Sequence, residues 1–116
     1  MMLSRVAVHV AVLLVVLRAA APTTAQQATA PFEPQVGQSG KDVVWVPTPQ
    51  ELVDKMLDMA QVTPTDYLID LGSGDGVTVI SAAKRGARAH GIEYDPRMVE
   101  LATRNAATAQ VRATWR

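Results

Sequence analysis

The chain has 116 residues, 48% of them hydrophobic, and its 11 basic side chains balance 11 acidic ones. This length allows at most one domain, and the apolar fraction is sufficient for a packed core. Zero net charge argues against a protein that binds nucleic acid by neutralising phosphates. The absence of cysteine excludes disulfides, thiolate zinc sites and cysteine nucleophiles. The two histidines, His9 and His90, lie far apart in the sequence, so no metal site is expected.

The N-terminal segment has the pattern of a secretory signal. Arg5 precedes an apolar run from Val6 to Leu17, and small residues then lead to Ala25. A basic start, a short apolar stretch and a small-residue site are typical of a signal peptide. The run of about 12 residues is shorter than the ~20 that cross a bilayer. We therefore predict a signal peptide over residues 1–25, cleaved after Ala25, and export to the periplasm or the medium. An uncleaved membrane anchor and a cytoplasmic protein remain alternatives.

The composition changes after this segment. Residues 1–30 carry two basic side chains and no acidic one, whereas residues 31–116 carry nine basic and eleven acidic ones, a balance of −2. Residues 26–42 are rich in proline, glutamine, alanine, glycine and serine, which is typical of a flexible spacer. The domain is predicted to occupy residues 43–116.

The first expected element of this domain is an amphipathic helix over about residues 49–60. Thr48 suits the N-cap, Pro49 suits the first helical position, and Glu51 would complete a capping box. The apolar side chains that recur on one face of this helix are Leu52, Val53, Met56, Leu57 and Ala60. We expect this helix to cover an apolar surface.

Strands and helices then alternate along the chain. After a turn at 63–66 the sequence predicts a buried strand over 67–71, a helix over 77–84, a strand over 87–93, a helix opened by Asp95 and Pro96, and the beginning of a third strand within 110–115. This alternation indicates an α/β fold, in which a parallel sheet has right-handed crossovers and helices on its faces.

A binding site is expected where the first two strands end, because ligands of open parallel sheets bind beyond the carboxyl ends of the strands. The first strand ends at Asp70 and leads into Gly72-Ser-Gly-Asp-Gly76. Glycines allow positive φ and close approach of a ligand, and the following helix favours an anion at its N-terminus. Asp70 could bind an ammonium group, and Glu93, at the end of the second strand, could accept bonds from ribose hydroxyls.

Two other interpretations were weighed for this loop. A dinucleotide fingerprint requires glycine at position 77, where this chain has Val77, which argues against NAD. The loop could also be a simple turn and Glu93 a solvated carboxylate, although a strand before the loop, a helix after it and an acid ending the second strand favour a site.

Three segments resemble one family. Asp-Leu-Gly-Ser-Gly-Asp-Gly at 70–76 and Gly-Ile-Glu-Tyr-Asp-Pro at 91–96 are similar to two motifs of the class I, seven-strand, Rossmann-like S-adenosylmethionine-dependent methyltransferases. Residues 98–106 resemble the helix that follows the second motif. Val-Trp-Val-Pro-Thr-Pro at 44–49 further resembles a branch related to protein-lysine methyltransferases.

The resemblance implies roles for individual residues. Gly72, Gly74 and Gly76 would border the methionine part of S-adenosylmethionine. Asp70 would face its amino group, and Glu93 would bind the ribose hydroxyls. Ser73 is expected among the cofactor-binding residues together with the glycines, and the alternative is that its side chain, like that of Asp75, only shapes the loop. Tyr94 would flank the adenine or simply pack. The branch usually has arginine where this chain has Val77.

The chain supplies only strands 1 and 2, and the beginning of strand 3, of the seven-strand fold. We therefore interpret it as the N-terminal, cofactor-binding part of a longer methyltransferase. The catalytic residues and the acceptor are not identified: a protein, protein lysine in particular, or a small molecule fits. The alternatives are a non-catalytic remnant that binds a nucleoside or S-adenosylmethionine, and a secreted domain without activity.

Overall fold

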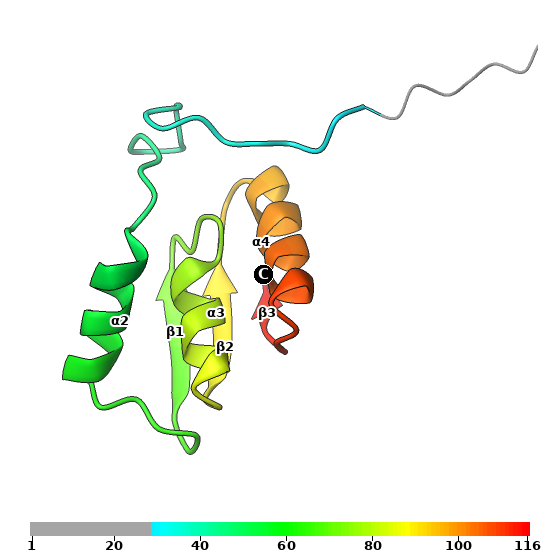
Figure 1. Ribbon diagram of the computed structural model, residues 1–116. Helices are drawn as coiled ribbons and strands as arrows, with labels where there is room; N and C mark the ends of the chain where they lie inside the picture. The colour runs from blue at the N-terminus through cyan, green and yellow to red at the C-terminus, as the bar shows by residue number, and fades with distance from the viewer. Residues whose placement is uncertain (1–28) are drawn as a thin grey trace, which may run out of the picture. The chain divides into compact units, whose positions relative to one another are not determined.

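The computed structural model describes residues 29–116, so the predicted signal peptide and its cleavage site after Ala25 lie outside the described part. Residues 31–116 form one unit. Its elements in chain order are α2 (Gln50–Met59), β1 (Tyr67–Leu71), α3 (Val77–Lys84), β2 (Arg88–Ile92), α4 (Pro96–Thr108) and β3 (Thr114–Trp115) (Figure 1). The alternation of helix and strand predicted from the sequence is confirmed.

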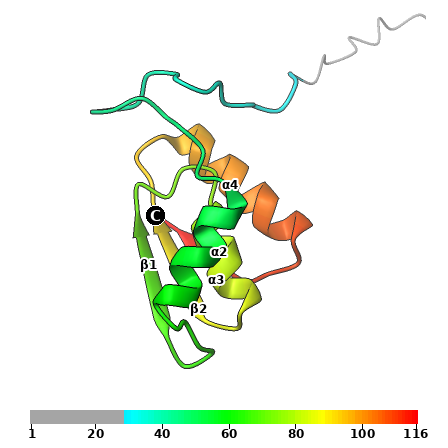
Figure 2. The same ribbon diagram turned by 60° about the vertical axis from the view of Figure 1, so that its left-hand side comes forward.

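The three strands form a parallel sheet in the order β1-β2-β3. Tyr67 lies opposite Arg88, and His90 lies opposite Thr114. All three helices lie on the same face of this sheet, rather than on both faces (Figures 1 and 2). For α3 and α4 the reason is that both crossovers run in one direction along the sheet, and right-handed crossovers in one direction place their helices on one side. Helix α2 precedes β1 and packs against α3.

The core lies between the sheet and the helices. Its buried apolar residues come from α2, α3 and the β2 region, and are Val53, Leu57, Val79, Ala82, Ala87 and Ala89. Helix α4 buries a further stripe that consists of Met98, Leu101, Ala102 and Ala106. Many of these residues are small, so the helices approach the sheet closely. Small changes of side-chain volume are therefore expected to lower the stability of the fold.

The opposite face of β1 is exposed. Tyr67 is 56% exposed, Ile69 54% and Leu71 79%, whereas Leu68 packs against the core. The sequence predicted a buried strand here, and that prediction is wrong for alternate residues. Successive side chains of a strand point to opposite faces, and no element of residues 29–116 covers the second face.

Helix α2 begins one residue later than expected. Pro49 is its N-cap and makes no side-chain capping bond, so the predicted Thr48–Glu51 capping box does not form. Val53 and Leu57 are buried, whereas Leu52 and Met56 are about half exposed. The buried stripe of α2 is therefore narrower than the sequence pattern indicated.

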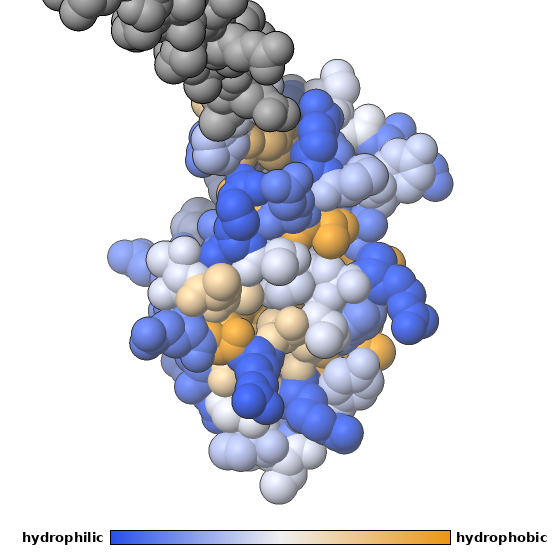
Figure 3. All heavy atoms as spheres, turned by 90° about the vertical axis from the view of Figure 1, so that its right-hand side faces the viewer, coloured by the Kyte–Doolittle hydropathy of each residue, from blue (hydrophilic) through white to orange (hydrophobic). Residues whose placement is uncertain are grey.

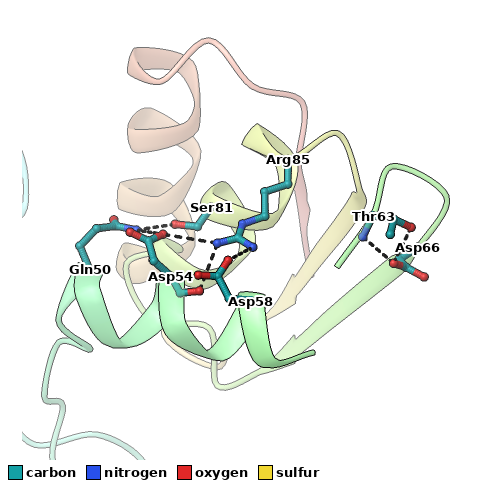
Figure 4. A network of polar contacts seen from close by, with 7 residues as sticks. All are labelled: Gln50, Asp54, Asp58, Thr63, Asp66, Ser81 and Arg85. Atoms are coloured by element: carbon teal, nitrogen blue, oxygen red, sulfur yellow. Dashed lines mark hydrogen bonds and ion pairs between the residues drawn. The ribbon is translucent and has the colours of Figure 1, made fainter. Parts of the chain in front are cut away.

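Polar contacts hold α2 against α3 (Figure 4). The Arg85 guanidinium forms an ion pair with Asp58 (Nη1–Oδ1 2.7 Å) and donates to the backbone oxygen of Asp54 (3.1 Å). Nearer the start of α2, Gln50 Nε2 donates to Ser81 Oγ at 2.9 Å. These contacts fix the helix along its length, and with it the segment that leads into the helix.

The side of the molecule that carries α4 is mostly hydrophilic, with small and separate hydrophobic patches (Figure 3). None of the helices within residues 29–116 has the length and apolar character required to cross a membrane.

Candidate functional site

The loop at 72–76 connects β1 to α3 and is attached to the end of β2. The amides of Gly72 and Ser73 both donate to the Ile92 carbonyl, at 2.8 and 3.0 Å. Gly72, Gly74 and Gly76 all have positive φ, at 78°, 54° and 85°. The glycines therefore meet the need of this loop for positive φ, because residues other than glycine rarely adopt such φ values.

The three glycines have different surroundings. A Cβ at Gly72 would meet no atom within 4 Å, so the backbone there faces open space. A Cβ at Gly76 would lie 2.9 Å from both Ala102 Cβ and Trp115 Cζ2. Gly76 thus allows α4 and β3 to pack closely, and it does not line the pockets described below.

Asp75 and Ser73 lie inside the loop. Asp75 Oδ1 accepts from the Val77 amide at 3.2 Å, and the Asp75 carbonyl accepts from Asn105 Nδ2 at 2.9 Å. Asp75 therefore ties the loop to α4. Ser73 is buried, and its hydroxyl has no hydrogen-bond partner among the described residues.

Glu93 braces the loop from the other strand. Its Oε2 accepts from the Gly74 amide at 2.8 Å, and its Oε1 accepts from the Asp95 amide at 2.9 Å. An ionised carboxylate has about four acceptor sites, so each oxygen can still accept one further bond. The structure brings Glu93 beside the glycine loop as predicted, and adds a bracing role that the sequence did not indicate.

Asp70 lies at the carboxyl end of β1. Burial raises the pKa of its carboxyl group, a hydrogen bond with Thr78 lowers it, and the charges of Asp75 and Glu93 raise it further. Three carboxylates, those of Asp70, Asp75 and Glu93, thus lie around one loop. A ligand with a positive group would offset this repulsion.

Two pockets lie above the loop. The larger, of about 440 Å³, is lined by residues 38–46 together with Gly72, Gly74 and the stretch from Ile92 to Asp95. The smaller, of about 190 Å³, is lined by residues that include Asp70, Ser73, Asp75 and Thr78. Gly72, Gly74, Trp45 and Val46 line both. The pockets therefore meet over the loop, with Asp70 in one and Glu93 and Tyr94 in the other.

Residues 37–46 form the outer wall of the larger pocket, which sequence reasoning missed. Gly37 N–H donates to the Trp45 carbonyl (2.8 Å), and Trp45 N–H donates to the Gln38 carbonyl (2.9 Å). The Lys41 ammonium lies 4.9 Å from the centre of the Tyr94 ring. The prediction had placed 26–42 in a spacer, and the apolar run from Val43 was the available signal for a structured segment.

His90 lies away from the pockets. Its Nδ1 is 2.6 Å from Thr114 Oγ1, so it joins β2 to β3. The arrangement above the loop suits a ligand with an ammonium group at one end, near Asp70, and sugar hydroxyls near Glu93.

Comparison with known proteins identifies relatives for this part of the chain. Residues 68–116 match the family model described as a methyltransferase domain. The chain is 40% identical over 65 residues to a protein-lysine N-methyltransferase from Saccharolobus islandicus, which is 54% of this chain and 40% of that protein. It is 43% identical over 49 residues to the ribosomal protein L11 methyltransferase of Thermus thermophilus, 42% of this chain and 19% of that protein.

A solved structure agrees with these sequence matches. The crystal structure of an RNA methyltransferase from Salinibacter ruber, in complex with S-adenosyl-L-homocysteine, superposes with a TM-score of 0.60 at 53% identity. The match covers 61% of this chain and 48% of that one. The chain thus spans less than half the length of each of these relatives.

Proposed function

We infer that the chain belongs to the S-adenosylmethionine-dependent methyltransferase family, binds S-adenosylmethionine over the loop at 72–76 and forms the cofactor-binding half of a methyltransferase. Two observations support a part of a longer enzyme: the match covers less than half of each of these relatives, and the apolar side chains on one face of β1 are exposed. The observation that carries the proposal is the placement of Asp70 and Glu93 on either side of a loop that has no side chain at Gly72.

The residues present fit this cofactor. Asp70 is a half-buried carboxylate whose pKa is raised by burial and by the charges of Asp75 and Glu93, and the ammonium group of the cofactor would offset both effects. Glu93 retains acceptor sites for two ribose hydroxyls. Gly72 leaves open space where the cofactor's methionine part would lie. Each feature of the site has a counterpart in the ligand.

The part of this chain in methyl transfer is to bind and orient. When bound, the cofactor supplies a sulfonium-activated methyl group, so the reaction depends mainly on alignment. Asp70 and Glu93 would hold the two ends of the cofactor, and the bonds from the loop to the Ile92 carbonyl and to Glu93 make that loop rigid. Preorganised contacts of this kind lower the entropic cost of reaching an aligned geometry.

For the acceptor we propose a protein lysine. The named relatives differ in acceptor: one is a protein-lysine, one a ribosomal-protein and one an RNA methyltransferase. The net charge of −2 over residues 31–116 favours a protein over an RNA as the methyl acceptor, because RNA binding requires an excess of basic groups.

Calorimetric titration of the full chain tests cofactor binding. We expect S-adenosylmethionine and S-adenosylhomocysteine to bind, and NAD, the matched control with an adenosine but no methionine, not to bind. Failure of both S-adenosylmethionine and S-adenosylhomocysteine to bind would favour the alternative of a domain whose glycine loop binds nothing.

Transfer of a labelled methyl group tests the second part of the proposal. The longer protein, of which we propose this chain to be the cofactor-binding half, is incubated with S-adenosylmethionine labelled in the methyl group and with either a protein extract or total RNA. We expect label in protein, lost when the lysines are blocked by acetylation beforehand. Cofactor binding without transfer to either pool would identify a non-catalytic binding remnant, and label in RNA would overturn the acceptor.

A further inference from the structure

Trp45 lies where the two pockets meet. It lines both of them, together with Val46, Gly72 and Gly74. Its indole Nε1 is 3.0 Å from the position that a Cβ on Gly74 would occupy. The indole therefore lies directly over the backbone of the glycine loop, between the side of the site with Asp70 and the side with Glu93.

We propose that Trp45 is a cofactor-binding residue, which closes the site over Gly74 and contacts the middle of the bound cofactor. This inference rests on the proposed function. It extends the site beyond the two strand ends, to a residue that lies outside both the loop and the family-matched range of 68–116.

The local structure holds the indole in place. The Trp45 carbonyl accepts from Gly37 N–H and its amide donates to the Gln38 carbonyl, so its backbone is paired on both sides. Pro47 and Thr48, two and three residues after Trp45, lead into α2, which contacts from Arg85 and Ser81 hold against α3. A side chain presented from a fixed backbone loses little conformational freedom when it binds a ligand.

The chemistry of the indole suits this position. It offers an apolar face and one N–H donor. The cofactor offers oxygen acceptors on its ribose and its carboxylate. An aromatic ring that both packs and donates is a frequent element of binding sites, where it contributes packing area and direction together.

The matched control for substitutions at Trp45 is Phe32, the other aromatic residue in the described segment that precedes α2. Its ring packs under the Arg97 guanidinium, 4.7 Å from the ring centre, and it lines neither pocket. Replacing it by leucine tests whether any loss of aromatic packing in this segment weakens the site.

The experiment is calorimetric titration of the full chain with S-adenosylhomocysteine. Trp45→Leu removes the ring and the donor, so we expect binding about tenfold weaker or worse. Trp45→Phe keeps a ring and removes the donor, so we expect a loss of about two- to fivefold. Phe32→Leu should bind within about twofold of the unaltered chain, which is the scatter expected of a surface change away from the site.

A second readout does not depend on the stability of these variants. Trp115→Phe leaves Trp45 as the sole tryptophan, and saturating S-adenosylhomocysteine should change its emission. Unchanged emission, or Trp45→Leu binding as tightly as the unaltered chain, would overturn this inference while leaving the proposed function in place. Absence of binding by the unaltered chain would overturn both.

Discussion

The carboxylate of Glu93 holds the glycine loop as well as facing the pocket. Each of its oxygens accepts one backbone N–H, from Gly74 and from Asp95, and both amides lie in the part-buried surroundings of the loop. A residue that looks like a ligand-binding acid in the sequence is also a structural one.

Replacing Glu93 by alanine should therefore weaken both the fold and binding. Two amides lose their acceptor, which costs on the order of 1–3 kcal/mol in the free energy of unfolding. The affinity for S-adenosylhomocysteine should fall at least about tenfold. Urea denaturation and calorimetry measure the two effects. Glu93→Gln, which keeps one acceptor oxygen, should lose less stability; full stability of Glu93→Ala would rule out the brace.

Gly72 tests the open space above the loop. Gly72→Ala places a methyl group where no atom lies within 4 Å, at a φ of 78°. The positive φ costs about 1–2 kcal/mol of stability, and the methyl group should additionally reduce cofactor affinity. Gly86→Ala, at a φ of 88° in the turn after α3, is the control for strain. If both variants kept normal affinity, the cofactor would not approach Gly72.

Asp70 makes binding depend on pH. Since burial raises the pKa of this carboxyl group, it becomes protonated at a higher pH than an ordinary aspartate as the solution is acidified. Protonated Asp70 cannot pair with an ammonium group, so cofactor affinity should fall as the pH drops through that pKa. Titrations between about pH 4 and 7 measure it.

Asp70→Asn separates the two consequences of this raised pKa. A folded-state pKa above the unfolded value means that ionised Asp70 opposes folding, and that its cost appears as the pH rises through this window. The variant should be at least as stable at neutral pH, bind the cofactor more weakly, and lose the pH dependence of binding. Unchanged affinity would exclude Asp70 as the ammonium partner.

At the scale of the elements, the side-chain caps predicted for α2 and α4 have different outcomes. Asp95 caps α4, with its Oδ1 accepting from the Arg97 amide at 2.9 Å, and Pro96 follows it as expected. Thr48 caps nothing, because Pro49 takes the N-cap position of α2. Similar sequence patterns therefore predicted a capping hydrogen bond that forms at α4 and one that does not form at α2.

Asp95→Ala should lower the free energy of unfolding by about 1 kcal/mol, whereas Thr48→Ala should change it by less than about 0.5 kcal/mol. The hydrogen bond and charge of Arg97 lower the pKa of Asp95, so its contribution is present above the unfolded pKa and is lost as the pH falls through the folded one. Urea denaturation at neutral and acid pH measures both variants. Equal losses at neutral pH would contradict the difference in capping.

At the scale of the whole molecule, one face of the sheet remains apolar and exposed. Tyr67, Ile69 and Leu71 project from it, and β1 has a strand partner on only one side within the described residues. Exposed apolar strands with a free edge favour association. Self-association of this chain by itself should therefore increase more steeply with protein concentration than self-association of its longer relatives.

The location of the protein follows from a different part of the chain. We propose export, because residues 1–25 carry the order of a signal peptide. S-adenosylmethionine is made inside cells, which conflicts with export and makes the experiment informative. Fractionation of expressing cells and N-terminal sequencing should find a mature start at Gln26 outside the cytoplasm. A soluble cytoplasmic product that begins at Met1 or Met2 would contradict the proposal and remove the conflict.

The sequence by itself determined the elements and the loop. The bounds of β1 and α3, and the positive φ at Gly72, Gly74 and Gly76, agree with what the residues indicated. These features depend on neighbours a few positions away: apolar runs set a strand, and glycines at alternate positions set a turn. The parallel sheet followed from the order of these elements, because right-handed crossovers leave few arrangements.

Only the tertiary structure decided how distant segments meet. Glu93 braces Gly74 across 19 positions, and the indole of Trp45 lies over that glycine from 29 positions before it. The one-sided placement of the helices left Ile69 exposed although its own strand is strongly apolar. Local pattern could not give these results, because a contact between distant segments depends on where each element packs, and burial depends on what covers a face rather than on the residues in it.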